Sequence, residues 1–230
     1  MNKIVSKEYF SEKVIKLEIE APLIVKSRKA GHFVICKVGE KGERIPLTIA
    51  AADTTKGTIT LVIQNVGRSS AKICALNEGD YIDNVVGPLG QATHIEKVGT
   101  VVCAGGGVGV APLLPIVEAF KKAGNRVIVV LAARTKELVI LEQQMRNNSD
   151  EVIIMTDDGS YGNKGLVTEG VESVIKREKV DMCVTIGPAV MMKFVSLLTK
   201  KYEIPTVASL NTIMVDGTGM CGACRITVGG

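Results

Sequence analysis

The chain has 230 residues, of which 46% are hydrophobic and 23% charged, with a formal net charge of +4. This composition fits one large or two modest globular domains, and interspersed charges argue against a nucleic-acid-binding protein. The first residues hold no apolar stretch of signal-peptide length and no apolar run reaches membrane-spanning length, so we expect a cytoplasmic protein without membrane association.

Short strands separated by turn signals fill the first part of the chain. Segments that alternate polar and apolar residues predict strands at 14–20, 32–38, 45–50, 57–66 and 80–86, with a short helix at 69–76. Five or six strands at this spacing predict a small antiparallel β-barrel.

The pattern changes near Val98 to apolar strands that alternate with helices. Strands are predicted at 100–104, 126–132, 151–156, 180–186 and 206–210, and helices at 111–123, 136–147, 166–179 and 188–201. This alternation predicts α/β architecture with a five-stranded parallel sheet covered on both faces. We therefore expect a barrel domain at 1–96, an α/β domain at 97–210 after a linker at 91–97, and a separate module at 211–230.

A glycine-rich loop follows the first strand of this sheet and precedes its first helix. Its five residues are Gly105, Gly106, Gly107, Val108 and Gly109. Glycines let the backbone approach a pyrophosphate, and a helix N-terminus carries partial positive charge. Val110 stands where the strict dinucleotide fingerprint has glycine, and a turn that serves only close packing is the alternative. The position at a strand's carboxyl end favours nucleotide binding.

Three further segments should reach the same sheet edge. Arg134 follows the second strand and either pairs with a phosphate, such as the 2′-phosphate of NADP, or is a solvated surface residue. Asp157 and Asp158 follow the third strand and are expected to order the turn or contact a ribose. Gly187 and Pro188 follow the fourth strand.

Two segments of the barrel half combine residue types that suit a flavin. Arg44, Pro46, Leu47 and Thr48 place a cation, a flat apolar surface and a hydroxyl close together. Farther along, Gln64 precedes a helix start at which Gly67, Ser69 and Ser70 offer N–H groups and hydroxyls to a phosphate. Each segment is a weak signal alone, and together they predict a flavin site.

The last residues contain the pattern D-x4-C-x2-C, formed by Asp216, Cys221 and Cys224. Plant-type ferredoxins use C-x4-C-x2-C for three cluster ligands, so a carboxylate here replaces the first thiolate. A zinc half-site and a redox disulfide are the alternatives. Residues 225–228 are predicted to begin a strand. The other cysteines are interpreted as buried thiols in a reducing cytoplasm: Cys36, Cys74, Cys103 and Cys183.

With these motifs in order, the chain resembles the ferredoxin–NADP reductase superfamily over essentially its whole length. It is most similar to the electron-transfer subunits of dihydroorotate dehydrogenase, sulfide dehydrogenase and NADH-dependent reduced ferredoxin:NADP oxidoreductase. Asp216 as first ligand resembles the sulfide dehydrogenase and bifurcating branch. Two departures are Arg44, one position earlier than the superfamily's flavin-phosphate arginine, and Ile186, where a cysteine often precedes Gly-Pro.

The resemblance implies an NAD(P)H-dependent flavin oxidoreductase subunit. FAD would lie at Pro46, Leu47 and Thr48, with its pyrophosphate near Gly67, Ser69 and Ser70, and NAD(H) or NADP(H) would lie over the glycine loop. A 2Fe–2S cluster would use Asp216, Cys221 and Cys224, with a fourth cysteine expected beyond residue 230, so the module at 211–230 would be truncated. Electrons would pass to or from a larger iron–sulfur flavoprotein subunit, through which ferredoxin could be reached.

Two other functions stay open at the sequence level. The first is the electron-transfer subunit of dihydroorotate dehydrogenase. The second, of another class, is a non-catalytic nucleotide-binding redox sensor with a Cys221–Cys224 disulfide.

Overall fold

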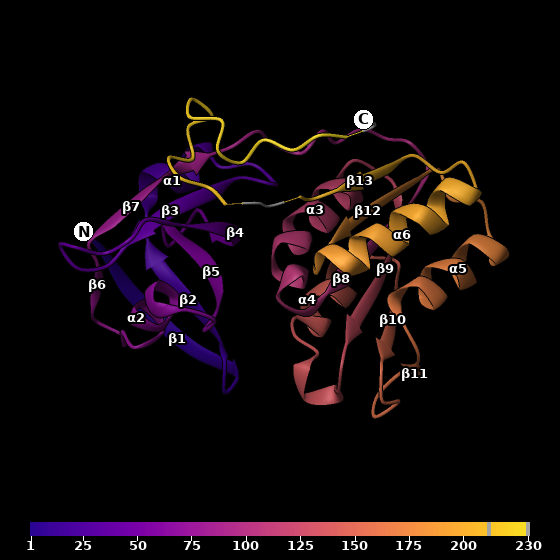
Figure 1. Ribbon diagram of the computed structural model, residues 1–230, viewed down its shortest axis with the longest axis horizontal. Coiled ribbons are helices and arrows are strands. Elements are labelled where there is room, and N and C mark those ends of the chain that lie inside the picture. The colour runs from indigo at the N-terminus through magenta and orange to yellow at the C-terminus, as the bar shows by residue number, and fades with distance from the viewer. Residues whose placement is uncertain (211–212, 229–230) are drawn as a thin grey trace. The chain divides into compact units, whose positions relative to one another are not determined.

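The computed structural model describes residues 1–210 and 213–228, and it divides the chain into two compact units (Figure 1). The boundary falls between Thr93 and His94, and residues 213–228 cluster with the first unit. No helix within the described ranges combines the length and apolarity that crossing a membrane would require.

The first unit is a nearly closed antiparallel barrel whose strand order is β6-β1-β2-β5-β4-β3-β7. Its elements are β1 (Asn2–Ser11), β2 (Val14–Glu20), α1 (Pro22–Ser27), β3 (Phe33–Lys37), β4 (Ile45–Asp53), β5 (Thr58–Gln64), α2 (Arg68–Cys74), β6 (Tyr81–Ile82) and β7 (Asn84–Leu89). Inward residues such as Ile4, Leu17 and Leu61 are fully buried in one core, and each such burial stabilises the fold by about 1.5–3 kcal/mol.

The second unit is a six-stranded parallel sheet in the order β11-β10-β9-β8-β12-β13. Its strands are β8 (Thr100–Gly106), β9 (Arg126–Ala133), β10 (Glu151–Thr156), β11 (Asn163–Lys164), β12 (Met182–Ile186) and β13 (Thr206–Ala208). Its helices are α3 (Val110–Lys122), α4 (Glu142–Asn148), α5 (Val167–Arg177) and α6 (Ala189–Lys201), with 3₁₀ turns η1 (Gly107–Gly109) and η2 (Lys136–Leu138).

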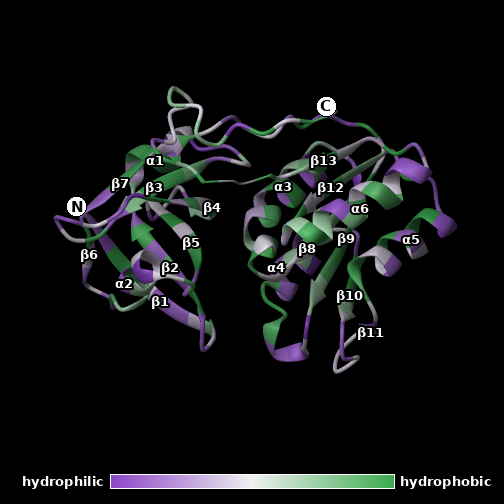
Figure 2. Cartoon of the chain, in the orientation of Figure 1, coloured by the Kyte–Doolittle hydropathy of each residue, from purple (hydrophilic) through white to green (hydrophobic). Residues whose placement is uncertain are grey.

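Helices cover both faces of this sheet, α3 with α4 on one side and α5 with α6 on the other (Figure 1). The central strands are largely hydrophobic (Figure 2), and residues Val101 to Ala104 and Val127 to Val130 are fully buried. Near-continuous apolar strands of this kind belong to a parallel sheet buried on both faces. The predicted fold class, an antiparallel barrel followed by a parallel α/β sheet, is confirmed.

Several elements differ from the sequence-based prediction. Strand β1 and helix α1 were not predicted, and β1 is long because it pairs with both β2 and β6. The helix predicted at 136–147 is interrupted, because Leu141 has a left-handed φ of 58° and α4 begins after it. Ile140 and Leu141 are only 6% and 8% exposed, so burial of these apolar side chains outweighs helix continuation.

The strand predicted at 225–228 is wrong, since these residues have no regular secondary structure. A strand needs a neighbour to satisfy its backbone hydrogen bonds, and within 213–228 no strand provides one.

A ring of four charged side chains joins the amino ends of β9 and β10 to the end of α5. Arg126 Nε donates to Glu178 Oε2 at 2.6 Å, and Arg177 Nη2 donates to Glu151 Oε2 at 2.6 Å. Arg126 also lies 3.5 Å from Glu151, and Arg177 lies 3.1 Å from Glu178. The hydrogen bond from Arg126 is the main reason why the pKa of Glu178 is lowered from its ordinary value of 4.5.

We predict that Glu178→Gln lowers the free energy of unfolding at pH 7 by less than about 1 kcal/mol, because exposed ion pairs contribute little. A depressed carboxylate pKa stabilises the fold above the unfolded pKa, and this contribution disappears as pH falls through the folded pKa. In urea unfolding, the difference between wild type and variant should therefore shrink as pH falls below the ordinary carboxyl pKa and through the lowered pKa of Glu178. Glu118→Gln on α3 is the control, and a difference for Glu178→Gln that persists undiminished at low pH would contradict the electrostatic origin.

Candidate functional site

The two segments predicted to hold a flavin lie next to each other at one end of the barrel. Strands β4 and β5 are antiparallel, with Ile49 opposite Leu61, so the start of β4 and the end of β5 share that end. Ser69 Oγ, at the start of α2, donates a hydrogen bond of 2.5 Å to Glu43 Oε2, just before β4. This bond ties the segment at 43–48 to the loop at 64–70.

Side chains alternate along the start of β4, which decides what each can contact. Ile45 and Leu47 pack against the barrel core. Pro46 and Thr48 therefore point to the opposite face, and both are half-buried. Thr48 is paired with Phe33 of β3, which holds its backbone in place. Leu47 thus has a packing role that the sequence did not indicate.

The serines before α2 already have protein partners. Ser70 Oγ accepts hydrogen bonds of 3.0 Å from the N–H groups of Val66 and Gly67, and it is only 8% exposed. Its role is to hold the turn that starts the helix, as an N-terminal capping side chain does. Gly67 has open space where a Cβ would stand, and Arg68 beside it is exposed. Arg68, present in the Gly-Arg-Ser-Ser run but not assigned from it, is a further cation beside this turn.

The glycines of the loop at 105–109 have two different roles, close packing and an open backbone face. A Cβ at Gly105 would lie 2.8 Å from Leu113 Cδ2, and one at Gly109 would lie 2.7 Å from the Cα of Gly187. These glycines permit close packing of β8, α3 and the segment after β12. Gly107 differs, because it has a φ of +55° and no atom within 4 Å of a built Cβ. The open face of the loop is therefore at Gly107.

The other predicted nucleotide segments lie along the same edge of the sheet. In the strand order β10-β9-β8-β12, the segments at 157–165, 133–136, 105–109 and 187–188 follow neighbouring strands. Asp158 N donates to Arg134 O at 3.3 Å, which joins two of these loops. The carboxylate of Asp158 accepts hydrogen bonds from Ser160 Oγ and N, which lower its pKa. Asp158 therefore orders its own turn, while Arg134 is exposed.

The segment with the Asp-Cys-Cys pattern packs beside the barrel through Gly217, where a Cβ would lie 3.1 Å from Ile35 Cγ1. The Asp216 carboxylate accepts hydrogen bonds from the N–H groups of Thr218 and Cys221, and the bond from Thr218 is the main cause of its lowered pKa. Cys221 and Cys224 are exposed free thiols.

The chemistry of these donors suits an iron–sulfur cluster, and the glycines at 217, 219 and 222 have the positive φ values of a tightly wrapped loop. In the structure, however, these side chains are not arranged around a common point as the ligands of one cluster would be. Across residues 1–210 and 213–228, no three side chains from histidine, cysteine, aspartate or glutamate are gathered around one point.

Comparison with known proteins shows relatives that span both units. The dihydroorotate dehydrogenase B (NAD(+)) electron transfer subunit homolog of Thermotoga maritima is 45% identical over 230 residues, which are 100% of this chain and 81% of that protein. The dihydroorotate dehydrogenase B (NAD(+)) electron transfer subunit of Desulforamulus reducens is 31% identical over 92% of this chain and 82% of its own length. No protein-family model matches the chain.

Two solved structures are also similar to this chain. The NADH-dependent reduced ferredoxin-NADP oxidoreductase, reported for insights into flavin-based electron bifurcation, has a TM-score of 0.94 at 43% identity over 99% of this chain and 82% of that chain. A ferredoxin NADP+ reductase from Neisseria gonorrhoeae with bound FAD and NADP has a TM-score of 0.72 at 16% identity over 91% of this chain and 98% of that chain. The second match shows the fold alone.

The barrel and parallel sheet are those of the ferredoxin–NADP reductase superfamily. Within it, the chain belongs to the family of dihydroorotate dehydrogenase B-type electron transfer subunits. This confirms the family that the sequence motifs indicated.

We predict that Gly107→Val weakens NADH binding at least tenfold and leaves flavin binding unchanged, because the β-branched side chain would fill the open face of the loop. Binding is measured by equilibrium titration of the purified protein. Gly124→Val is the matched control, since Gly124 has a φ of +83° and ends α3 at the other edge of the sheet. Equal loss of NADH affinity in both variants would mean that backbone strain alone is responsible.

Proposed function

We propose that the protein is the flavin- and iron–sulfur-dependent electron-transfer subunit of an oxidoreductase, moving electrons between NAD(P)H and a partner subunit. The observation that supports this most strongly is the 45% identity to an electron transfer subunit homolog across the entire chain. A second observation supports the proposal. Gly67 at the barrel end and Gly107 at the sheet edge lie in predicted cofactor loops, and each has open space where a Cβ would stand.

The barrel end fits FAD. When bound there, FAD would accept a hydride from the nicotinamide ring and release electrons singly. Thr48 would direct its hydroxyl to the reactive edge of the flavin, and Pro46 would contact the ring from the same face of β4. Gly67, with its open N–H side, would lie at the pyrophosphate, while Ser69 and Ser70 hold the turn and Arg44 and Arg68 supply positive charge.

The sheet edge fits a nicotinamide nucleotide. The backbone around Gly107, at the start of α3, would face the pyrophosphate. We favour NADH over NADPH, because both relatives named above carry NAD(+) in their names. Arg134 is exposed beside the loop of Asp158, a position from which a guanidinium could also contact a 2′-phosphate.

Asp216, Cys221 and Cys224 would supply three ligands of a 2Fe–2S cluster. A carboxylate in place of a thiolate changes the hardness of the ligand set. The partner would be a larger iron–sulfur flavoprotein subunit of the ferredoxin:NADP oxidoreductase type, because the similar solved structure is that of an NADH-dependent reduced ferredoxin-NADP oxidoreductase. A dihydroorotate dehydrogenase partner is the second candidate, since the relatives' names favour it.

We predict that Thr48→Ala retains FAD but slows flavin reduction by NADH roughly 10²-fold, because a positioned hydrogen bond at the reacting centre is lost. Stopped-flow absorbance at the flavin band measures the rate. Thr54→Ala, in the exposed turn after β4, is the control. An unchanged rate in Thr48→Ala would remove Thr48 from the reacting centre.

We predict that the protein, purified without oxygen, contains FAD, iron and acid-labile sulfide, and that NADH bleaches its flavin absorbance. Cys221→Ser should lose the iron and sulfide and keep FAD, because an alkoxide is a poor substitute for a soft thiolate. Cys36→Ser, at a buried thiol of the barrel core, is the control. A protein with FAD but without iron would be inconsistent with the electron relay, and Cys221 and Cys224 would then form a disulfide or a zinc half-site.

A further inference from the structure

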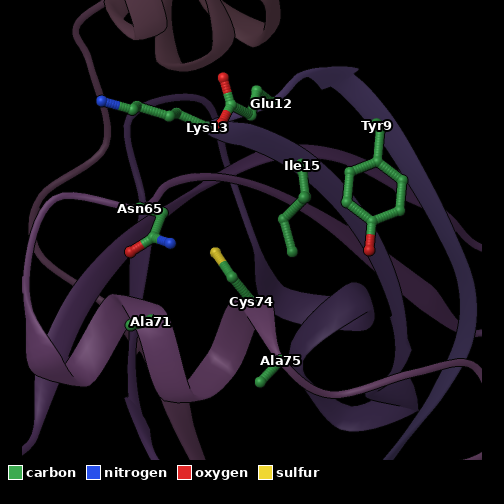
Figure 3. A pocket seen from close by; sticks show the side chains of 8 residues that line it. All are labelled: Tyr9, Glu12, Lys13, Ile15, Asn65, Ala71, Cys74 and Ala75. Atoms are coloured by element: carbon green, nitrogen blue, oxygen red, sulfur yellow. The ribbon is translucent and has the colours of Figure 1, made fainter.

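A pocket of about 200 Å³ opens beside α2 within the barrel unit (Figure 3). Its lining includes Asn65, which directly follows β5, and Ala71 and Cys74 of α2. Cys74 is half-buried there, so the prediction of a buried thiol is wrong for this cysteine. The pocket belongs to the barrel end that carries the predicted flavin segments. A separate surface, outside both candidate cofactor sites, is the outer face of α6 in the α/β unit (Figure 1).

Three large apolar side chains lie in a row on this outer face. Val190, Phe194 and Leu197 are 67%, 55% and 47% exposed. Their spacing of four and then three residues places them on one side of a helix. These three residues are called the α6 stripe below. Single exposed apolar residues are common on protein surfaces, whereas a row of them along one helix face marks a candidate interaction surface.

The α6 stripe is held in an outward orientation by the packing of the opposite helix face. Met192, Val195 and Thr199 are buried there, where α6 lies against β12 and β13. Thr206 Oγ1 of β13 donates a hydrogen bond of 2.6 Å to Thr199 Oγ1, which fastens the helix to the edge strand. The stripe therefore cannot turn inward unless the helix leaves the sheet.

Positive charge surrounds the α6 stripe. Helix α6 contains Lys193, Lys200 and Lys201 and no acidic residue, and all three lysines are exposed. Among residues 1–210 and 213–228, no ion pair includes any of these lysines. Glu172 on the adjacent α5 is already paired with Lys176 at 3.1 Å. Carboxylates of a partner would therefore meet lysines without a competing ion pair.

Shape and charge together favour one kind of occupant. From Val190 to Lys201 the helix rises by about 16 Å, which matches three turns of a second helix packed along it. A second copy of this chain is disfavoured, because a two-fold contact through the stripe would bring the lysines of both copies together. A lipid surface is also disfavoured, because an interfacial helix buries a broad apolar face in the membrane, and the stripe is narrow.

We propose that the α6 stripe docks an amphipathic helix of another protein, one that carries aspartates and glutamates beside its apolar face. The apolar side chains of that helix pack on the stripe, and its carboxylates pair with Lys193, Lys200 and Lys201. Phe194, at the centre of the row, is the anchor, since aromatic side chains contribute strongly to such interfaces. The inference does not depend on the proposed function, because no residue of the stripe belongs to either candidate cofactor site.

The probe for this surface is a synthetic helical peptide of about 14 residues, or four turns, with leucines spaced like the stripe and glutamates on both flanks. A covalent staple keeps it helical, since isolated helices of this length are marginal in water. Fluorescence anisotropy measures its binding to the whole chain. Wild type should bind it, and Phe194→Glu should raise the Kd at least tenfold, because a carboxylate would be buried without a partner. Leu23→Glu, at an exposed leucine of α1, is the matched control and should bind as wild type does.

The contribution of charge is tested separately. Lys193→Glu combined with Lys200→Glu should weaken binding of the glutamate peptide about tenfold and strengthen binding of a peptide with lysines in place of the glutamates. Lys122→Glu, at the end of α3, is the control for charge reversal. A rise in salt from about 0.05 M to about 0.5 M should weaken wild-type binding, because the salt screens the lysines. Circular dichroism verifies that each variant is folded.

Three outcomes would overturn the docking surface. The first is that wild type does not bind the glutamate peptide, or that Phe194→Glu binds it equally well. The second is a dimer in analytical ultracentrifugation that Phe194→Glu dissociates, which would assign the stripe to a second copy. The third is cosedimentation with phosphatidylserine vesicles that Phe194→Glu abolishes, without peptide binding, which would assign the stripe to a membrane. None of these outcomes bears on cofactor binding, so the proposed function is tested independently.

Discussion

The α/β unit depends on one constraint, which is the close approach of two backbone segments at the carboxyl edge of its parallel sheet. Gly109 faces Gly187 at a separation where a Cβ would stand 2.7 Å from the opposing Cα. No larger residue fits there without moving α3 or the segment after β12. Because the contact holds β8, α3 and the Gly187–Pro188 turn together, the one glycine not used for packing, Gly107, is presented with its face open.

A similar division of labour holds at the barrel end. The hydroxyl of Ser70 holds the turn before α2, and the hydroxyl of Ser69 donates to Glu43. The two hydroxyls that most resemble phosphate ligands therefore maintain the local backbone structure. The remaining open positions are backbone at Gly67 and the face of β4 that carries Pro46 and Thr48. Binding at the two candidate sites would thus rely on positioned backbone more than on ionisable side chains, which suits chemistry carried by a cofactor.

In the segment at 213–228, one carboxylate stabilises the local loop structure and also belongs to a candidate set of metal ligands. Asp216 holds the loop through the N–H groups of Thr218 and Cys221, and these bonds favour its charged form. A metal ligand must likewise be deprotonated. The same hydrogen bonds therefore maintain the loop geometry and keep Asp216 in the charged form that a metal ligand would need, and the bond from Cys221 N fixes the backbone of Cys221 relative to Asp216.

The sequence alone determined the two types of sheet, most of their strands, the positions of the candidate cofactor loops and the family. These features depend on patterns within short windows, such as the alternation at 14–20, the apolar strand at 126–132 and the glycines at 105–109. The tertiary structure decided which glycine is open, that Leu47 faces the core, that the serines have protein partners and that Cys74 lines a pocket. Those outcomes depend on residues distant in the chain, such as Glu43 beside Ser69 and Gly187 beside Gly109. A local pattern holds no information about a partner that only folding brings into contact.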